Sequence, residues 1–445
     1  MRISSEEAIA WIHRRIPVGQ RPGLRRVNRL LKMVGHPERN VPTIHIGGTN
    51  GKGSTVTYLS CLLQETGLSV GTFTSPYIEC FNERLSINGQ PISDEQLIAY
   101  VEKYQPLVMR LDEVQETKGI TEFELLTVMA FDYFSNMQVD VLIMEVGIGG
   151  RWDSTNVCHP LLTAITTIGK DHTDILGETL TDIAGQKTGI IKPYVPVVTG
   201  PLPKEALRVV QKEAGKQQSQ LYCLGEGFQV SYEHPADFWG ELFHYYSRNL
   251  SLYDLRLPLA GRHQIENAGV ALCLYELFCE LNELPVCSDN IYRGFLRVQW
   301  PARMEPVNQT PLIILDGAHN EAAVERLVET IQNEFCHQQV FILFSALVTK
   351  DIQKMLLLLQ AIPNVRVYVT TFSYPKAMVF DESWFKEYPE VSHAADWQEL
   401  IHHFKQTMNK NELLIVTGSL YFVSQVRQLL ISETKNETAK QSKKK

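Results

Sequence analysis

Short apolar runs alternate with segments of helical periodicity along most of the chain. Residues 41–46 form the first apolar run, and residues 54–65 then carry apolar side chains three or four positions apart, which predicts a strand followed by a helix. The run at 139–146 is almost continuously apolar, as in a strand buried on both faces. Further elements are predicted as strands at 68–74, 161–168 and 195–199 and a helix at 122–137. Strands that alternate with helices predict a doubly wound, mostly parallel sheet of an α/β fold.

The pattern changes twice in the second half of the chain. Residues 228–259 alternate aromatic and polar positions, which predicts a small β-rich appendage of a few antiparallel strands. A second α/β pattern begins near residue 299 and predicts a smaller Rossmann-like domain. We therefore expect a first domain at 1–298, a second domain at 299–432 and a disordered tail at 433–445, because the tail lacks large apolar residues.

Composition and charge narrow the possible functions. The chain has 445 residues, of which 44% are hydrophobic and 21% charged, and its net charge is −8. These values are typical of a globular protein. The acidity argues against a nucleic-acid binder, which needs a positive surface to displace counterions. Anionic ligands must therefore be attracted by local charge, backbone NH groups or metal ions.

The sequence also predicts a cytoplasmic protein without a membrane partner. Its first residues include early acids and no apolar segment of the kind found in signal peptides. No apolar run approaches the roughly 18 residues that span a bilayer. The eight cysteines include no C-x-x-C pair, so we expect reduced, mostly buried thiols rather than a zinc or redox motif.

The strongest local signal is a glycine-rich run between the first strand and the first helix of the sheet. It reads Gly47-Gly48-Thr49-Asn50-Gly51-Lys52-Gly53-Ser54-Thr55. Glycines let backbone NH groups approach phosphate oxygens, and the helix N-terminus adds partial positive charge. Lys52 can reach the β- and γ-phosphates, and Ser54 or Thr55 can offer a hydroxyl to Mg²⁺. The extra Gly53 distinguishes this run from the common G-x-x-x-x-G-K-[ST] loop.

Two further polar residues should lie at the same edge of this sheet. Glu145 lies near the end of the apolar run at 139–146, where its carboxylate could hold Mg²⁺ or serve only as an edge or capping acid. His172 follows the strand predicted at 161–168. A lone histidine there is more often structural, but beside Glu145 and a phosphate loop it could also bind metal.

A similar arrangement follows the first parallel strand of the second domain. Asp316 and His319 come directly after the apolar run at 312–315. Asp316 could accept hydrogen bonds from a ribose hydroxyl, and His319 could contact phosphate. The segment could equally be a helix cap formed by Asp316 or Asn320.

Taken with these residues, further motifs resemble those of the folylpolyglutamate synthases and dihydrofolate synthases of the Mur ligase superfamily. The phosphate loop with its extra glycine is similar to theirs. The other motifs follow in chain order up to about residue 420: Thr74-Ser75-Pro76, Phe81-Asn82-Glu83-Arg84, Glu145 to Arg151, Asp153-Ser154-Thr155-Asn156, Asp171-His172-Thr173, Lys187 to Lys192, Trp300-Pro301-Ala302-Arg303, Asp316 to Asn320 and Thr417-Gly418-Ser419.

The resemblance implies a P-loop domain of the Mur ligase central type, a C-terminal glutamate ligase domain and an ATP-dependent amide ligase. ATP would phosphorylate the γ-carboxylate of a folyl-(poly)glutamate, and the amine of L-glutamate would attack the acyl phosphate. The same mechanism could convert dihydropteroate to dihydrofolate, and the sequence does not decide between these acceptors. The partners would be ATP, a reduced folate or dihydropteroate and L-glutamate, and the family resemblance implies a monomer.

Site residues are implied position by position. The catalytic set is Lys52, Glu145, His172 and Lys187. The ATP-binding set is Thr49, Asn50, Gly51, Lys52, Gly53, Ser54, Asn267, Arg303 and Asp316. The set for two Mg²⁺ ions is Ser54, Ser75, Glu145, His172 and Lys187 as a carbamate. The glutamate-binding set is Arg84, His319 and Ser419, and the folate-binding set is Thr121, Phe123 and Asp153.

Lys187 gains its role only through the resemblance. Composition alone indicates an exposed helical lysine at this position. In the family the matching lysine is often carbamylated by CO₂, which converts an ammonium into a carboxylate-like metal ligand. A requirement for K⁺ is left open by the resemblance.

Two departures from the family and two alternative functions stay open. Ala302 replaces a glycine that many relatives carry, and Trp152 stands where smaller or aliphatic residues are common. A Mur-type ligase of cell-wall precursors would share the loop and Lys187, although Gly53 and the Phe81–Arg84 motif argue against it. A regulatory P-loop ATPase would leave Glu145, His172 and Lys187 without a purpose.

Overall fold

The computed structural model describes residues 3–15, 23–237, 239–380, 384, 388 and 390–442, with side chains described up to Glu433. The chain divides into two compact units. The first consists of Met1–Glu233, Leu242–Leu257 and Gln264–Val298, and the second of His234–Glu241, Pro258–His263 and Gln299–Lys445. The second unit thus includes two short segments that the sequence analysis assigned to the first domain.

An eight-stranded sheet forms the centre of the first unit. Its order is β4-β3-β2-β5-β1-β6-β7-β8, and β3 and β4 are the antiparallel strands at one edge. The strands are β1 (Thr43–Gly47), β2 (Val70–Phe73), β3 (Leu85–Ile87), β4 (Gln90–Pro91), β5 (Val141–Glu145), β6 (Leu162–Ile165), β7 (Val197–Thr199) and β8 (Leu221–Cys223). Every residue of β1 and β5 is buried, as the continuous apolar runs predict. The expected mostly parallel sheet is confirmed.

The strand order places a topological switch point beside β1. The chain leaves β1 and crosses over β5 to reach β2, whereas it leaves β5 and crosses over β1 to reach β6. Ile46 of β1 is paired with Glu145 of β5 and Ala164 of β6, so the loops that follow these three strands begin at the same level of the sheet. Ligands of open parallel sheets bind at the carboxyl ends of the strands next to such a point.

Helices cover this sheet and extend the first unit. They are α1 (Ser5–His13), α2 (Arg25–Met33), α3 (Lys52–Gln64), α4 (Asp94–Asp112), α5 (Glu122–Asn136), α6 (Thr173–Leu176), α7 (Leu180–Lys187), α8 (Lys204–Lys216), α9 (Arg262–Leu281) and α10 (Ser288–Leu296). Short 3₁₀ turns lie at η1 (Pro37–Arg39), η2 (Phe81–Arg84), η3 (Ser154–Val157) and η4 (Thr188–Ile190). The helices α1 and α2 pack against α4 and α5 around one apolar core.

The β-rich segment forms a separate three-stranded sheet in the order β11-β10-β9. The strands are β9 (Phe228–Pro235), β10 (Glu241–Ser247) and β11 (Ser251–Leu257). Few residues separate these strands in the sequence, and parallel neighbours would need long crossovers, so the strands run antiparallel. Buried positions alternate with accessible ones along β10, as the sequence pattern predicts.

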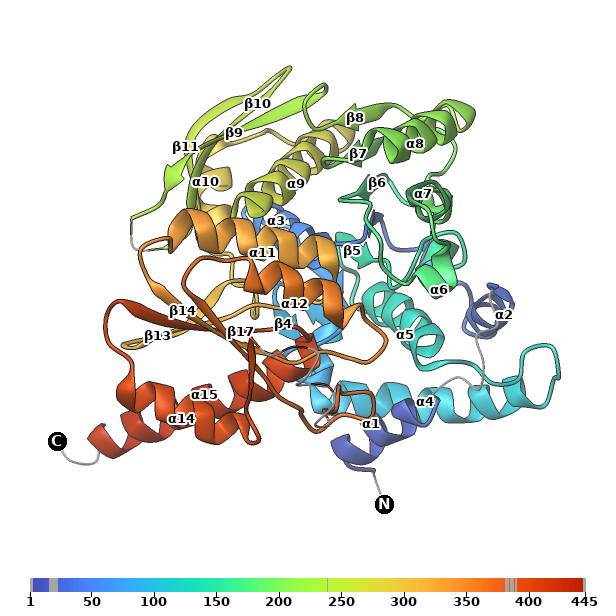
Figure 1. Cartoon of the computed structure of the whole chain (residues 1–445). Helices are drawn as coiled ribbons and strands as arrows, with labels where there is room; N and C mark the ends of the chain where they lie inside the picture. The colour runs from blue at the N-terminus through green and yellow to red at the C-terminus, as the bar shows by residue number, and fades with distance from the viewer. Residues whose placement is uncertain are drawn as a thin grey trace. The chain divides into compact units, whose positions relative to one another are not determined.

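The second unit has a six-stranded sheet in the order β12-β13-β17-β14-β15-β16, of which β12 alone is antiparallel to its neighbour. Figure 1 shows α11 and α12 on one side of this sheet and α14 and α15 on the other. The elements are β12 (Glu305–Gln309), β13 (Leu312–Leu315), α11 (Glu321–Glu334), β14 (Gln339–Phe344), α12 (Ile352–Gln360), β15 (Val365–Val369), β16 (Val391–His393), α14 (Trp397–Thr407), β17 (Glu412–Thr417) and α15 (Leu420–Ser442). The expected second α/β domain is therefore present.

The expectation of a disordered tail at 433–445 is wrong for most of its length. Helix α15 continues through Ser442, and residues 443–445 lie outside the described residues. Lys405 of α14 holds the start of this stretch through Glu433, at an Nζ–Oε2 distance of 2.8 Å. Beyond it the sequence contains Lys, Glu, Ala and Gln, which have high helix propensity and can extend an existing helix without tertiary packing.

All eight cysteines are free, and half of them are buried: Cys158, Cys223, Cys273 and Cys279. Cys80 and Cys336 are exposed, so the expectation of mostly buried thiols holds only in part. No helix in the described ranges is long and apolar enough to cross a membrane.

A buried carboxylate holds together the two short segments that belong to the second unit. Glu241 is 1% exposed, and its Oε1 accepts a 2.5 Å hydrogen bond from the Gly261 NH. Its Oε2 has no hydrogen-bond partner among the described residues. Burial raises the pKa of Glu241 to about 7; the Gly261 NH opposes this rise, and nearby Glu334 adds to it.

We expect Glu241→Gln to stabilise the protein at alkaline but not at acidic pH. Because the folded-state pKa lies above the ordinary value of 4.5, the folded state binds more protons than the unfolded state between these values. Stability therefore falls as pH rises from about 5 to 8, and glutamine removes this loss. Thermal unfolding at both pH values should show wild type and variant alike at pH 5 and the variant about 2 °C more stable at pH 8. Equal differences at both values would contradict the assignment.

Candidate active site

The glycine-rich run joins β1 to α3 at the switch point of the first sheet. Gly51 is the N-cap of α3 and has a φ of 85°, a conformation that favours glycine. A Cβ at Gly51 would overlap Oδ1 of Asn267, and a Cβ at Gly48 would overlap Oγ1 of Thr166. Asn267 of α9 thus lies directly against the loop. Both glycines are needed because other side chains occupy the space beside them.

Two threonines after β6 hold the loop in this shape. The Asn50 NH donates to Oγ1 of Thr167 at 2.9 Å, and the Thr49 NH donates to the Thr167 carbonyl at 2.8 Å. The hydroxyl of Thr166 donates to the Asn50 carbonyl at 2.6 Å. Thr166 and Thr167 are not among the residues predicted from the sequence. Two adjacent hydroxyl residues at the end of a predicted buried strand were the signal that could have indicated them.

Two lysine ammonium groups meet at one carbonyl of the loop. Lys52 Nζ lies 3.1 Å and Lys187 Nζ 2.8 Å from the Gly48 oxygen. Lys187 is only 3% exposed, so the prediction of an exposed helical lysine is wrong. Lys187 instead lies beside the phosphate loop, as the family resemblance implies. Burial, with Lys52 nearby, lowers the pKa of Lys187 to about 7. A fraction of Lys187 is therefore neutral near pH 7.

Glu145 and Ser75 lie together at the same rim. Glu145 is the last residue of β5 and is 4% exposed. Its Oε2 accepts a 3.0 Å hydrogen bond from the Ser75 NH. Ser54, in the first turn of α3, is also buried. The carboxylate of Glu145 and the hydroxyls of Ser54 and Ser75 supply hard oxygen ligands of the kind that Mg²⁺ prefers.

His172 lies at the N-terminus of α6, half-buried and with a φ of 50°. The ring Nε2 of His172 is 4.0 Å from Oδ1 of Asp171, and the backbone NH of His172 donates to the same oxygen at 2.8 Å. The segment that leads to it borders the loop, because the Gly169 NH donates to Oγ1 of Thr49 at 3.0 Å. His172 thus lies between β6 and α6, in the segment that follows the strand.

The predicted folate residues surround the turn that follows Glu145. Asp153 is 7% exposed and accepts a 2.8 Å hydrogen bond from the Ile148 NH. The Phe123 ring packs so closely on Gly147 that a Cβ there would overlap it. Thr121 caps α5, since its hydroxyl accepts from the Glu124 NH at 3.2 Å. Phe123 and Asp153 thus lie together, whereas the Thr121 side chain is engaged by the helix.

Arg84 is buried with its guanidinium partly paired. Its Nη2 lies 3.4 Å from Oε1 of Glu122, and its guanidinium carbon lies 5.3 Å from the Tyr77 ring centre and 5.5 Å from that of Phe81. Its Nε has no hydrogen-bond partner among the described residues. A buried, incompletely satisfied guanidinium has unused capacity for a carboxylate.

The second unit gathers its predicted residues where β13 and β17 end. Asp316 is buried and accepts from the Met304 NH at 3.0 Å and the Ala318 NH at 2.9 Å. Burial raises the pKa of Asp316, and Arg303 opposes this rise. The Gly418 NH donates to the Ala318 carbonyl at 3.0 Å, which joins this turn to the segment that carries Ser419.

The alternative of helix capping is correct for Asn320 and not for Asp316. Oδ1 of Asn320 accepts from the Ala323 NH at 3.0 Å at the start of α11. His319 lies between them, half-buried, with Nδ1 2.8 Å from the Gly317 carbonyl. Ala302 has a φ of 57°, a left-handed conformation that glycine adopts without strain, which explains why a glycine suits this position.

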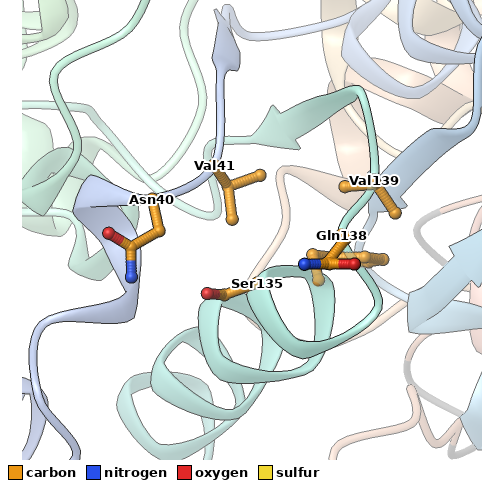
Figure 2. A pocket seen from close by; sticks show the side chains of 6 residues that line it. Asn40, Val41, Ser135, Gln138 and Val139 are labelled. Carbon is orange, nitrogen blue, oxygen red and sulfur yellow. The ribbon is translucent and has the colours of Figure 1, made fainter.

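A hollow of about 370 Å³ lies away from these residues. Figure 2 shows it between the end of α5 and the segments that lead into β1 and β5. Its lining includes Asn40, Val41, Ser135, Gln138 and Val139. Because these residues precede the strands, the hollow is at the amino edge of the sheet, opposite to the phosphate loop.

A further group of polar residues lies on the three-stranded sheet. Glu233, His244 and Asp254 place one potential metal ligand each within 4.8 Å of the others. His244 Nδ1 accepts from the Asp254 NH at 3.0 Å, and Nε2 lies 3.7 Å from Glu233. The three residues therefore form a surface cluster in which His244 lies between two carboxylates.

Comparisons with known proteins agree with this geometry. Residues 46–275 match the Mur ligase middle domain, and residues 302–420 match the Mur ligase glutamate ligase domain. The chain is 40% identical over 429 residues to a dihydrofolate synthase/folylpolyglutamate synthase of Bacillus subtilis, covering 96% of this chain and 99% of that protein. It is 35% identical to a folylpolyglutamate synthase of Lacticaseibacillus casei, covering 96% and 98%.

Solved structures show the same likeness. A folylpolyglutamate synthase of Mycobacterium tuberculosis in complex with ADP has a TM-score of 0.88 at 30% identity, covering 96% of this chain and 98% of that chain. A folylpolyglutamate synthase in complex with AMPPCP and folate has a TM-score of 0.86 at 34% identity, covering 96% and 100%. The fold and the phosphate loop thus define an ATP-binding enzyme of the Mur ligase superfamily. Within it, the chain belongs to the folylpolyglutamate synthase/dihydrofolate synthase family, as the motifs predict.

We expect Lys52→Ala to lower the rate of ATP-dependent turnover at least about 100-fold, because it removes a positive charge from the phosphate loop. Phosphate release at saturating substrates measures this loss. The matched control is Lys204→Ala, at an exposed lysine on the first turn of α8. Near wild-type turnover of Lys52→Ala would refute the assignment of Lys52.

Proposed function

We propose that this protein is an ATP-dependent ligase that adds L-glutamate to the γ-carboxylate of a folyl-(poly)glutamate. The observation that carries the proposal is the convergence of Lys52 and Lys187 on the Gly48 carbonyl, with Glu145 on the neighbouring strand. The relatives that share this chain over 96% of its length are named for folate ligation. Their names support the same substrate here.

The reaction needs an activated acid and shielding of negative charge. A carboxylate is a poor electrophile, so its oxygen attacks the γ-phosphorus of ATP, and ADP leaves. The amine of glutamate then attacks the acyl carbon, and phosphate leaves from the tetrahedral intermediate while the nitrogen loses a proton. Lys52 is placed to neutralise charge on the transferred phosphoryl group.

The nucleotide and the two acids are assigned to separate groups of residues. We infer ATP contacts for the loop Thr49–Ser54 and for Asn267, Arg303 and Asp316. We infer glutamate contacts for Arg84, His319 and Ser419, and folate contacts for Thr121, Phe123 and Asp153. The incomplete pairing of Arg84 and the placement of Phe123 beside Asp153 support these inferences.

The residues at the rim fit Mg²⁺. Ser54, Ser75, Glu145 and His172 would hold two ions, with Lys187 as a carbamate ligand. Held by these residues, Mg²⁺ would supply positive charge against the negative charge of the phosphates. The lowered pKa of Lys187 supports carbamylation, since only the neutral amine attacks CO₂. K⁺ is part of the proposal as a further ion without an assigned site.

We also propose a monomeric, cytoplasmic enzyme whose partners are small molecules. The two alternative functions are less well supported. A cell-wall precursor ligase would require substrates other than those in the names of the relatives at 40% and 35% identity. A regulatory ATPase would not need a buried lysine at the phosphate loop.

We expect the purified protein to convert ATP, L-glutamate and a reduced folate into ADP, phosphate and a folate one glutamate heavier. Mass spectrometry of the products measures this addition directly. A parallel reaction with dihydropteroate tests dihydrofolate synthase activity. ATP hydrolysis that is independent of both acceptors and of glutamate would reject the ligase proposal, and turnover of a UDP-linked acceptor would favour the cell-wall alternative.

We expect Lys187→Ala to lower activity by about 10- to 100-fold and to lower the affinity for Mg²⁺, as loss of a metal-supporting residue does. If a carbamate is the active form, short carboxylates such as acetate should restore part of the rate. Lys192→Ala is the control. Burial also lowers the pKa of Lys192, but its ammonium donates to the Asn156 carbonyl instead of to the phosphate loop. Unchanged activity of Lys187→Ala would exclude a role in catalysis.

A further inference from the structure

A buried chain of three side chains connects β1 to the turn after β5. His45, two residues before Gly47, is fully buried, and its Nε2 lies 2.8 Å from Oγ1 of Thr155. The same hydroxyl donates to Oδ1 of Asp153 at 2.5 Å. No part of the proposed reaction uses His45 or Thr155, and strand pairing does not require a histidine at this position.

The hydrogen-bond capacities of the three groups fix the direction of the chain. A threonine hydroxyl has one proton, and an ionised carboxylate can only accept. Because that proton goes to Asp153, the Thr155 oxygen must accept from His45, which therefore carries its proton on Nε2. Burial lowers the pKa of His45 to about 3, and its Nδ1 has no hydrogen-bond partner among the described residues, which agrees with a neutral ring.

Asp153 is held by hydrogen bonds from Thr155 and from the turn that carries Ile148. Its Oδ1 accepts from both the hydroxyl and the NH of Thr155, and its Oδ2 accepts from the Ile148 NH. Burial raises the pKa of Asp153, and the bonds from Thr155 and Ile148 lower it. The carboxylate is thus kept in a single orientation beside Phe123, in the turn that directly follows Glu145.

We propose that His45 is a positioning residue of the ligase: by donating from Nε2 to Thr155 it orients Thr155, which in turn fixes the Asp153 carboxylate for the folate acceptor. This inference rests on the proposed folate role of Asp153. It links β1, the strand that leads into the phosphate loop, to Asp153, the residue proposed to contact the folate acceptor.

The test measures KM for the folate acceptor and KM for ATP separately, at saturating glutamate. Thr155→Val keeps the side-chain shape and removes the hydroxyl, so we expect a folate KM raised about tenfold, with the ATP KM within about twofold. Thr155→Ser, which keeps the hydroxyl, should remain near wild type. A general packing defect would change both KM values or affect Thr155→Ser equally.

Variants of His45 test the direction of the hydrogen bond. The amide nitrogen of glutamine can replace Nε2, whereas that of asparagine is placed nearer to Nδ1. We expect His45→Gln to retain a near wild-type folate KM, and His45→Asn and His45→Leu to resemble Thr155→Val. The double variant His45→Leu with Thr155→Val should be no worse than Thr155→Val alone, since the residues act in series. If the histidine variants do not fold, Thr155→Val and Thr155→Ser decide the question.

Two further variants separate the possible failures. Thr43→Val removes a buried hydroxyl from the same strand, where it donates to the Val41 carbonyl, and should leave the folate KM unchanged. Asp153→Asn tests the proposed folate role itself. An unchanged folate KM in Asp153→Asn would reject that role and the inference built on it. A raised KM in Asp153→Asn, with folded Thr155→Val at wild-type values, would overturn the positioning role alone.

Discussion

The phosphate loop depends on one constraint: while Lys187 is uncarbamylated, the loop backbone must accommodate two lysine amines at the Gly48 carbonyl at once. Two like charges at one oxygen repel each other, so the arrangement needs fixed geometry and a reason for one charge to be weak. Thr166 and Thr167 supply the geometry by binding the backbone of Thr49 and Asn50. Burial supplies the reason, because it lowers the pKa of Lys187 and makes it the weaker cation.

The same constraint reconciles an acidic protein with acidic ligands. A net charge of −8 provides no long-range attraction for ATP, folate or glutamate. The local charges are instead buried or half-buried at the rim, where the low dielectric strengthens their interactions. Arg84 illustrates the point, since it is held between Glu122 and two aromatic rings rather than in solvent.

The sequence indicated most of the sheet and much of the rim, for identifiable reasons. A buried parallel strand such as β5 is an almost continuous apolar run, and a charged residue near the end of such a run, like Glu145, must lie at the rim. Lys187 could not be placed in this way, because its position depends on the path of α7 relative to a distant loop. Thr166 and Thr167 were missed because a hydroxyl residue after a strand is common and shows no partner in the sequence. The helical tail was missed because the sequence after Glu433 shows no apolar periodicity from which a helix could be predicted.

Both units apply one arrangement to different tasks. In the first, the phosphate loop follows β1 and the two threonines follow the neighbouring strand β6, and these two loops bind one another. In the second, Asp316 follows β13 and Gly418 follows β17, and the NH of Gly418 binds the Ala318 carbonyl. In each case the sheet sets the level at which the polar residues emerge, and bonds between adjacent loops set their orientation. A histidine inside β1 is the exception, since it reaches the rim only through Thr155. A histidine buried in a central strand has to be explained by what it binds, and here the bound group is a threonine hydroxyl already committed to Asp153.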